Sequence, residues 1–359
     1  MKVAPLFHAL RPETWCNVAL VHTGQHYDEN MSDAFFRDLG LPQPDHHLGV
    51  GRGTHAEQTG GVMIAYERLC LKAPPNWIVV VGDVNSTLAC ALVGAKLGIK
   101  VAHLEAGLRS RDRRMPEEIN RLVTDALADL LWTPSPDADA NLRAEGIAPE
   151  RIERVGNIMI DSYELMRPMI ESRRTRERFG LTWRGYGVVT LHRPSNVDDE
   201  SMLRRLVNEL CTVGSELPLV FPAHPRTLQR LISFALLPVL EAIPSIKVVE
   251  PMGYTDFMSL VSEAKLVITD SGGVQEETTY LGIPCLTLRD TTERPITVFE
   301  GTNQLVQVAA LAHTVRSVVA SGEKKARIPA LWDGHTAERV VKSLRAKVVV
   351  REERGRRLI

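Results

Sequence analysis

Short apolar runs that alternate with amphipathic segments are the feature that most restricts the fold of this chain. The runs are rich in Val, Ile and Leu, without the polar alternation of a strand that has one solvated face. They cover residues 17–24, 77–83, 99–107, 130–135, 151–156, 187–193, 217–224, 246–252, 265–273 and 284–290. Strands covered on both faces, with helices between them, are typical of α/β proteins with parallel sheets.

The length of the chain predicts two domains. Its 359 residues exceed the size at which one hydrophobic core usually stops growing. A charged, interrupted stretch at residues 165–186 is the natural break. We therefore expect two doubly wound, Rossmann-like domains, over residues 1–168 and 169–340. The basic segment 341–359 is expected to form a helix or tail that packs back on the N-terminal domain.

Composition excludes several classes of partner. A formal net charge of −1 argues against a nucleic-acid binder or a basic membrane surface, and no apolar run reaches the length of a membrane span. The cysteines are scattered without a CxxC pair, so neither a metal site nor a disulfide framework is predicted. A reducing cytoplasm is the expected compartment. These cysteines are Cys16, Cys70, Cys90, Cys211 and Cys285.

The segment of residues 265–284 predicts an anion site at the end of a strand. Its apolar run ends in Asp270, Ser271, Gly272 and Gly273, and Glu276 and Glu277 follow. Glycines let a ligand approach the backbone, and the free N–H groups of the next helix favour a diphosphate. One of the two acids can then accept hydrogen bonds from sugar hydroxyls. The alternative is a plain strand-to-helix turn whose acids favour the helix dipole.

Three carboxylates follow strands or open a helix in the N-terminal half. Asp83 and Glu105 come after buried runs, while Glu117 stands in the first turn of a helix that starts at Pro116 and shares a face with Arg121. Clustered carboxylates raise one another's pKa, which acid–base chemistry exploits. Each of the three acids also has a structural alternative: Asp83 as a turn cap, Glu105 as a paired loop acid and Glu117 as a partner of the helix dipole.

The C-terminal half adds two histidines at strand ends. His192 and His224 suggest anion contact or proton transfer, although a single histidine is more often structural. Another polar strand exit carries Arg289, Glu293 and Arg294, which either close a cleft or pair with each other.

Taken together, these motifs resemble the non-hydrolysing UDP-N-acetylglucosamine 2-epimerase family. The resemblance covers nearly the whole chain and lies in the motifs TGQHYDENM, GDVNSTLA, HLEAGLRS, MPEEINR, GNIMID, LHRPSN, DSGGVQEE and RDTTERP. It implies two Rossmann-like domains in a glycosyltransferase-B arrangement with an interdomain cleft. It also implies reversible interconversion of UDP-GlcNAc and UDP-ManNAc through loss of UDP and a bound 2-acetamidoglucal, without NAD or metal. The product would serve cell-surface polysaccharide synthesis, and the enzyme would be a homodimer.

The resemblance also implies roles for individual residues. The catalytic residues it implies are Asp83, Glu105, Glu117 and His192. The substrate contacts it implies are Arg121, His224, Ser271, Gly272, Gly273 and Glu277. Gln25 and His224 lie in motifs that some bacterial members use for activation by UDP-GlcNAc, so regulation is a hypothesis.

Two departures from the family leave alternatives open. The family opens with a strand and a Gly-Thr-Arg-Pro-Glu loop whose arginine binds the diphosphate, whereas this chain begins at the segment that matches the following helix. We expect a gap in the first sheet and a longer natural chain. The motif HRPSN replaces His-Arg-Arg-Glu and suggests a related substrate, such as a diacetamido uronic acid sugar nucleotide. A UDP-sugar glycosyltransferase, a hydrolysing epimerase and a non-enzymatic UDP-sugar sensor are the other candidates.

Overall fold

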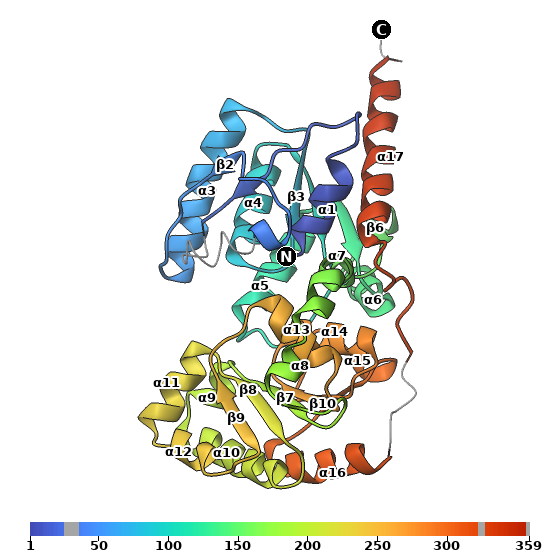
Figure 1. Cartoon of the computed structure of the whole chain (residues 1–359). Coiled ribbons are helices and arrows are strands. Elements are labelled where there is room, and N and C mark those ends of the chain that lie inside the picture. Colours follow the sequence, from blue (N-terminus) through green and yellow to red (C-terminus); the bar gives the residue numbers. More distant parts are fainter. Residues whose placement is uncertain (25–35, 322–326, 357–359) are drawn as a thin grey trace. The chain divides into compact units, whose positions relative to one another are not determined.

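The computed structural model describes residues 1–24, 36–321 and 327–356 (Figure 1). It divides into two compact units: unit 1 comprises Met1–Leu165 with Ala330–Ile359, and unit 2 comprises Met166–Pro329. In the part of the chain that the structure describes, no helix is both long enough and apolar enough to cross a membrane.

Unit 2 contains a six-stranded parallel sheet in the order β12-β11-β10-β7-β8-β9. Its strands are β7 (Gly187–Thr190), β8 (Leu219–Pro222), β9 (Ile246–Val249), β10 (Leu266–Thr269), β11 (Cys285–Thr287) and β12 (Asn303–Leu305). The first strand, β7, is therefore central, and the chain reverses its direction of progress between β7 and β10. This is the doubly wound order, whose ligands bind beyond the carboxyl ends of the strands at that switch point.

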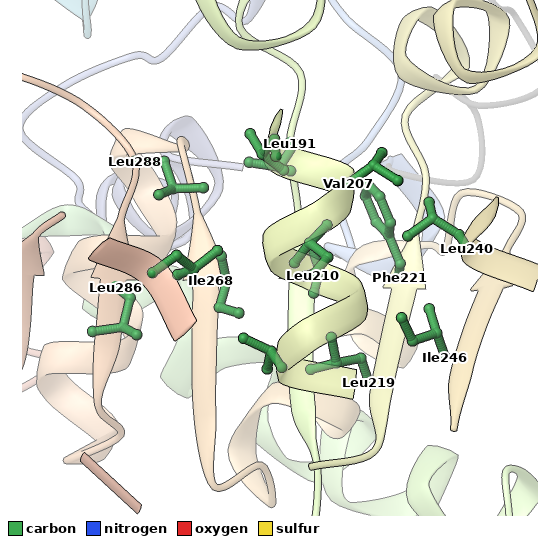
Figure 2. Packing of buried hydrophobic residues seen from close by; sticks show 14 of the residues in the cluster. Leu191, Val207, Leu210, Leu219, Phe221, Leu240, Ile246, Ile268, Leu286 and Leu288 are labelled. Carbon is green, nitrogen blue, oxygen red and sulfur yellow. The ribbon is translucent and has the colours of Figure 1, made fainter. Parts of the chain in front are cut away.

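Helices cover the unit 2 sheet and bury its apolar side chains. They are α8 (Thr175–Arg178), α9 (Pro194–Val197), α10 (Glu200–Gly214), α11 (Pro225–Ser233), α12 (Leu237–Glu241), α13 (Tyr254–Ser262), α14 (Gly272–Leu281), α15 (Ile296–Phe299) and α16 (Leu311–Ser321). Helix α10 is capped by Asp199, whose carboxylate accepts a hydrogen bond from the Met202 N–H at 2.8 Å. Its apolar stripe, including Val207 and Leu210, packs against the sheet beside Phe221 (Figure 2).

Unit 1 is built on a four-stranded parallel sheet in the order β3-β4-β5-β6. Its strands are β3 (Trp77–Val81), β4 (Lys100–Leu104), β5 (Leu130–Thr133) and β6 (Ile152–Arg154). A separate parallel pair is formed by β1 (Val21–His22) and β2 (His46–His47). Among the described residues this pair does not hydrogen-bond to β3.

The helices of unit 1 include one that follows unit 2 in the chain. They are α1 (Val3–Leu10), α3 (His55–Lys72), α4 (Asn85–Lys96), α5 (Pro116–Leu127), α6 (Pro136–Ala144) and α17 (Thr336–Arg356), while α7 (Ile158–Arg173) crosses the boundary between the units. Helix α17 packs beside α1, where Val340 and Leu344 share a buried cluster with Leu6 and Leu10. Trp132 of β5 also donates its indole N–H to the Ser343 hydroxyl at 2.8 Å.

The α/β class and its parallel strands are confirmed. Each of the predicted apolar runs contains one of the observed strands. The strands β2 and β12 were not predicted, because their sequences, His-His and Asn-Gln-Leu, do not form apolar runs. Proline at the first turn of α5 and the helix that follows it also agree with prediction.

Candidate functional site

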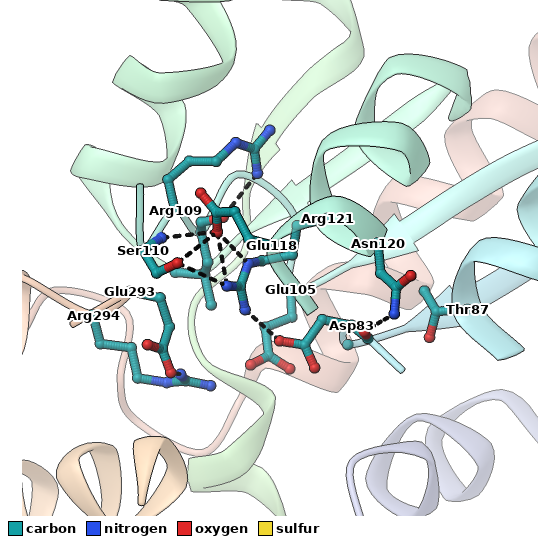
Figure 3. A network of polar contacts seen from close by, with 12 residues as sticks. Asp83, Thr87, Glu105, Arg109, Ser110, Glu118, Asn120, Arg121, Glu293 and Arg294 are labelled. Carbon is teal, nitrogen blue, oxygen red and sulfur yellow. Dashed lines mark hydrogen bonds and ion pairs between the residues drawn. The ribbon is translucent and has the colours of Figure 1, made fainter. Parts of the chain in front are cut away.

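Two of the predicted acids lie at neighbouring strand ends of unit 1. Strand β3 runs into Gly82 and Asp83, and the adjacent β4 runs into Glu105. The Glu105 Oε2 atom lies 3.7 Å from the position that a Cβ on Gly82 would take, so this carboxylate lies beside the turn that carries Asp83 (Figure 3). Parallel topology thus brings together two carboxylates from separate motifs.

Glu105 has an unusual backbone conformation. Its φ is +78°, in the left-handed region that residues with a side chain rarely adopt. The residue is held there because its N–H donates to the Trp132 carbonyl at 3.1 Å and its carboxylate pairs with Lys2. Strained backbone that is held by its surroundings clusters at functional sites, which supports a functional role for Glu105.

Arg121 organises the acids around Asp83. Its guanidinium is buried and contacts Asp83 Oδ2 at 2.5 Å and Glu118 Oε2 at 2.8 Å (Figure 3). Asn120 donates to the Asp83 carbonyl at 2.8 Å. These two residues of helix α5 therefore hold Asp83 in place, while 27% of the Asp83 side chain stays exposed.

The two adjacent acids of α5 have different roles in the fold. Glu118 is buried and accepts hydrogen bonds from the Ser110 N–H at 2.9 Å and the Arg111 N–H at 2.9 Å. Burial opposes its ionisation, but these N–H groups and Arg121 outweigh burial, so the pKa of Glu118 lies below its ordinary value. Glu117 is exposed. Arg121 contacts Glu118 and Asp83, and Glu117, which lies four residues before Arg121 on the same helix, has no hydrogen-bond or ion-pair partner among the described residues.

A buried cluster that sequence reasoning missed lies behind these strand ends. His103 contacts Asp125 Oδ1 at 2.6 Å and the Gly82 carbonyl at 2.8 Å. Asp125 also accepts from the Gly107 N–H at 3.0 Å and contacts Arg109 at 2.7 Å. Burial opposes protonation of His103, but Asp125 outweighs it and raises the pKa of His103. The cluster fixes the turns before Asp83 and after Glu105; the only signal in the sequence was a histidine inside an apolar run.

In unit 2, the N-terminus of α14 lies at the switch point of the sheet. The strand before it, β10, is next to β7, and Gly272 and Gly273 form the first turn of the helix. Ser271 precedes the helix, and its side chain makes no capping hydrogen bond. The first N–H groups of the helix and the Ser271 hydroxyl are thus suited to bind an anion.

The structure gives the two acids of α14 separate partners. Glu276 contacts Arg294 Nε at 2.9 Å, and it lies in a buried ionic cluster with Arg289 and Glu293. Arg289, Glu293 and Arg294 therefore pair with each other, which is one of the two alternatives that the sequence left open. Glu277, one position further, accepts a hydrogen bond from the Tyr254 hydroxyl at 2.7 Å.

Two histidines face each other beyond the carboxyl ends of β7 and β8. The rings of His192 and His224 are 5.8 Å apart between centroids. His224 precedes α11, and its Nδ1 accepts from the Arg226 N–H at 3.2 Å. Burial, and then electrostatic interaction with His192 and Arg226, lower the pKa of His224. Gln25 lies outside the described residues.

Comparisons with known proteins agree with this arrangement. The family model for UDP-N-acetylglucosamine 2-epimerase matches residues 8–345. A UDP-N-acetylglucosamine 2-epimerase of Methanocaldococcus jannaschii is 44% identical over 311 residues, which cover 85% of each chain. A UDP-2,3-diacetamido-2,3-dideoxy-D-glucuronate 2-epimerase of Pseudomonas aeruginosa is 40% identical over 313 residues, which cover 86% of this chain and 85% of that one.

Solved structures show the same similarity. The M. jannaschii UDP-GlcNAc 2-epimerase in complex with UDP-GlcNAc and UDP has a TM-score of 0.88 at 41% identity, with 96% of each chain covered. The Neisseria meningitidis enzyme bound to UDP-GlcNAc has a TM-score of 0.87 at 26% identity, with 96% of this chain and 95% of that one covered. On this evidence the chain belongs to the UDP-N-acetylglucosamine 2-epimerase family.

Proposed function

We propose that this protein reversibly interconverts UDP-GlcNAc and UDP-ManNAc by inverting C2 of the sugar. The observation that carries the proposal is the N-terminus of α14, with Ser271, Gly272 and Gly273, at the switch point of the unit 2 sheet, where it is suited to bind an anion. Membership of the family and the UDP-GlcNAc bound by its solved relatives supply the substrate class.

In this proposal, residues of unit 2 hold the UDP. The N–H groups at the start of α14 and the Ser271 hydroxyl take the diphosphate, because they offer donors and a positive dipole end. Glu277, oriented by Tyr254, accepts from the ribose hydroxyls. His192 and His224 are additional contacts for the ligand. These donors stabilise the negative charge that develops on UDP as it leaves.

The acid–base chemistry is assigned to the carboxylates of unit 1. One group removes the C2 proton while the C1–O bond to UDP breaks, which gives a C1–C2 double bond. A proton then returns to C2 on the opposite face, and UDP adds back at C1. Asp83, Glu105 and Glu117 are the proposed acids and bases, because inversion needs proton transfer on both faces of the sugar. The sequence of steps conserves oxidation state, so the proposal includes no redox cofactor.

An isotope experiment tests the elimination step. UDP-GlcNAc carrying ¹⁸O at the oxygen between C1 and the β-phosphate is incubated with the protein and followed by ³¹P NMR. The proposal predicts UDP-ManNAc together with scrambling of ¹⁸O into the two non-bridging β-phosphate oxygens, because the β-phosphate of released UDP can rotate before UDP adds back. Inversion without scrambling would refute the elimination. Free sugar would indicate hydrolysis, and no reaction would leave the transferase or sensor alternatives. The diacetamido uronic acid analogue tests the other substrate in parallel.

We expect Tyr254→Phe to weaken UDP binding by about 3- to 10-fold, because one hydrogen bond that orients Glu277 is lost. Calorimetric titration with UDP alone measures the effect without turnover. Tyr186→Phe is the matched control, since the Tyr186 hydroxyl donates to the Leu260 carbonyl at 2.5 Å within the core of the same unit. That variant should lose stability and keep its UDP affinity. Equal UDP affinity in Tyr254→Phe and the wild type would contradict the assignment of Glu277.

The homodimer and the cytoplasmic location remain predictions, as do the polysaccharide pathway and activation through Gln25 and His224. Light scattering of the purified protein tests the first of them. A hyperbolic rate curve without a lag would contradict activation by substrate.

A further inference from the structure

Asp270, at the end of β10, is completely buried. Its oxygens accept hydrogen bonds from the His192 N–H, at 3.1 Å to each oxygen, the Arg193 N–H at 2.9 Å and the Asn196 side chain at 3.0 Å. These donors lie in the segment after β7, so Asp270 joins the two strand ends at the switch point.

The same carboxylate also contacts the ring of His192. Asp270 Oδ1 lies 2.9 Å from His192 Nδ1. Burial opposes ionisation of Asp270, but His192 and the neighbouring donors outweigh burial, so the pKa of Asp270 lies below its ordinary value. An ionised carboxylate only accepts hydrogen bonds, so His192 Nδ1 must carry a hydrogen.

The other ring nitrogen of His192 is left available. His192 Nε2 has no hydrogen-bond partner in the described parts of the chain, and 40% of the side chain is exposed. A neutral His192 therefore presents a lone pair on Nε2. If Nε2 takes a proton, Nδ1 keeps its hydrogen, and Asp270 stays ionised beside the imidazolium. This is the arrangement by which a carboxylate orients a catalytic histidine in hydrolases of other folds.

We propose that Asp270 is a positioning residue that acts through His192, fixing the Nδ1–H tautomer so that Nε2 is the atom that meets the UDP-sugar. In the neutral ring, Nε2 accepts a proton; in the imidazolium, it donates to a diphosphate oxygen. The catalytic part of this inference rests on the proposed function. The tautomer itself does not, because it belongs to the protein without substrate.

The alternative is that Asp270 only holds the segment after β7 in place. Asp270→Asn separates the two roles, because an amide oxygen still accepts from backbone N–H groups. The amide NH₂, however, donates to Nδ1 and therefore favours the Nε2–H tautomer. Asn196→Ala is the matched control: it removes a donor to Asp270 and leaves the contact between Asp270 and His192 intact.

The first experiment is ¹⁵N NMR of the imidazole nitrogens in the wild type without substrate. The inference predicts a hydrogen on Nδ1 of His192, with Nε2 as the unprotonated nitrogen at alkaline pH. In Asp270→Asn the pattern should reverse, and in Asn196→Ala it should stay as in the wild type. An Nε2–H tautomer in the wild type would overturn the inference, even if Asp270→Asn failed to fold.

The second experiment is a double-mutant cycle on turnover. We expect Asp270→Asn to lower kcat by about 100-fold or more with a small change in KM. In a His192→Gln background the same change should alter kcat by no more than about threefold, because residues that act as a unit are not additive. Additive losses, or a loss in KM alone, would show that Asp270 is purely structural. If the wild type shows no epimerisation at all, the proposed function fails. The NMR result still decides whether Asp270 fixes the Nδ1–H tautomer of His192.

Discussion

Glu105→Gln should lower kcat by about 10²- to 10⁴-fold and leave the fold intact. The amide keeps the shape of the side chain but cannot take or deliver a proton at C2, and a positioned acid or base contributes about that much. The variant keeps the left-handed backbone at residue 105 and an acceptor for Lys2. We therefore expect KM to change little.

Initial rates by a coupled assay for UDP-ManNAc, together with thermal unfolding, measure this effect. Glu153→Gln is the matched control, because Glu153 on β6 of the same unit contacts Lys347 at 2.9 Å. That variant should keep kcat within about threefold of the wild type, as a half-exposed ion pair contributes little. A folded Glu105→Gln protein with more than about a tenth of the wild-type kcat would remove Glu105 from the mechanism.

The second large effect is expected on stability, from Arg294→Met. Arg294 is buried between Glu276 at 2.9 Å and Glu293 at 2.5 Å. Without Arg294, the buried carboxylates keep only part of the positive charge that balances them. Breaking a buried ion pair in this way costs about 3–5 kcal/mol. We expect the free energy of unfolding to fall by that amount at neutral pH.

The pH dependence of Arg294→Met follows from Glu293. Burial opposes ionisation of Glu293, but Arg294 and Arg289 outweigh burial and hold its pKa well below the ordinary value. A group with a lowered folded-state pKa stabilises the protein above its unfolded pKa and loses that contribution as the pH falls through the folded value. The wild type should thus lose this stability in acid. In the variant the carboxylates become easier to protonate, so the difference from the wild type should shrink below about pH 4.5.

Urea unfolding at several pH values tests this prediction. Arg316→Met is the control, because Arg316 and its partner Glu216 are exposed and such a pair contributes less than about 1 kcal/mol. A loss in Arg294→Met as small as that in Arg316→Met would mean that the buried cluster does not support α14. A difference that grows in acid would contradict the assigned charges.

The sheet of each unit could be predicted because its strands are covered on both faces. An uninterrupted apolar run as short as residues 77–81 is typical of a strand inside a sheet, since a buried helix needs a longer run. The proximity of Asp83 and Glu105 followed from the same reasoning, because parallel strands bring their carboxyl ends to one edge. The strands β2 and β12 could not be predicted, because their short segments are mostly polar and so lack the apolar run that marks the other strands.

The partners of the site residues could not be predicted. Tyr254 contacts Glu277, and Asp270 contacts His192 across 78 positions of the chain, so sequence spacing carries no signal for either pair. Helical spacing placed Glu117 and Arg121 on one face, but residues three apart on a helix are also neighbours, and Glu118 is the one that contacts Arg121. A buried polar side chain such as His103 can be recognised in the sequence as a polar residue inside an apolar run. Its hydrogen-bond partners can be identified only from the folded structure.

The central claim is that this protein inverts C2 of a UDP-sugar by removing and returning a proton. The most direct test is incubation with UDP-GlcNAc in D₂O, followed by ¹H NMR of the sugar. Proton transfer at C2 predicts UDP-ManNAc with deuterium at that carbon. In Glu105→Gln the rate of this exchange should fall far below the wild-type rate. Formation of UDP-ManNAc that retains its original C2 hydrogen, or no C2 exchange in a folded protein that binds UDP, would contradict the claim.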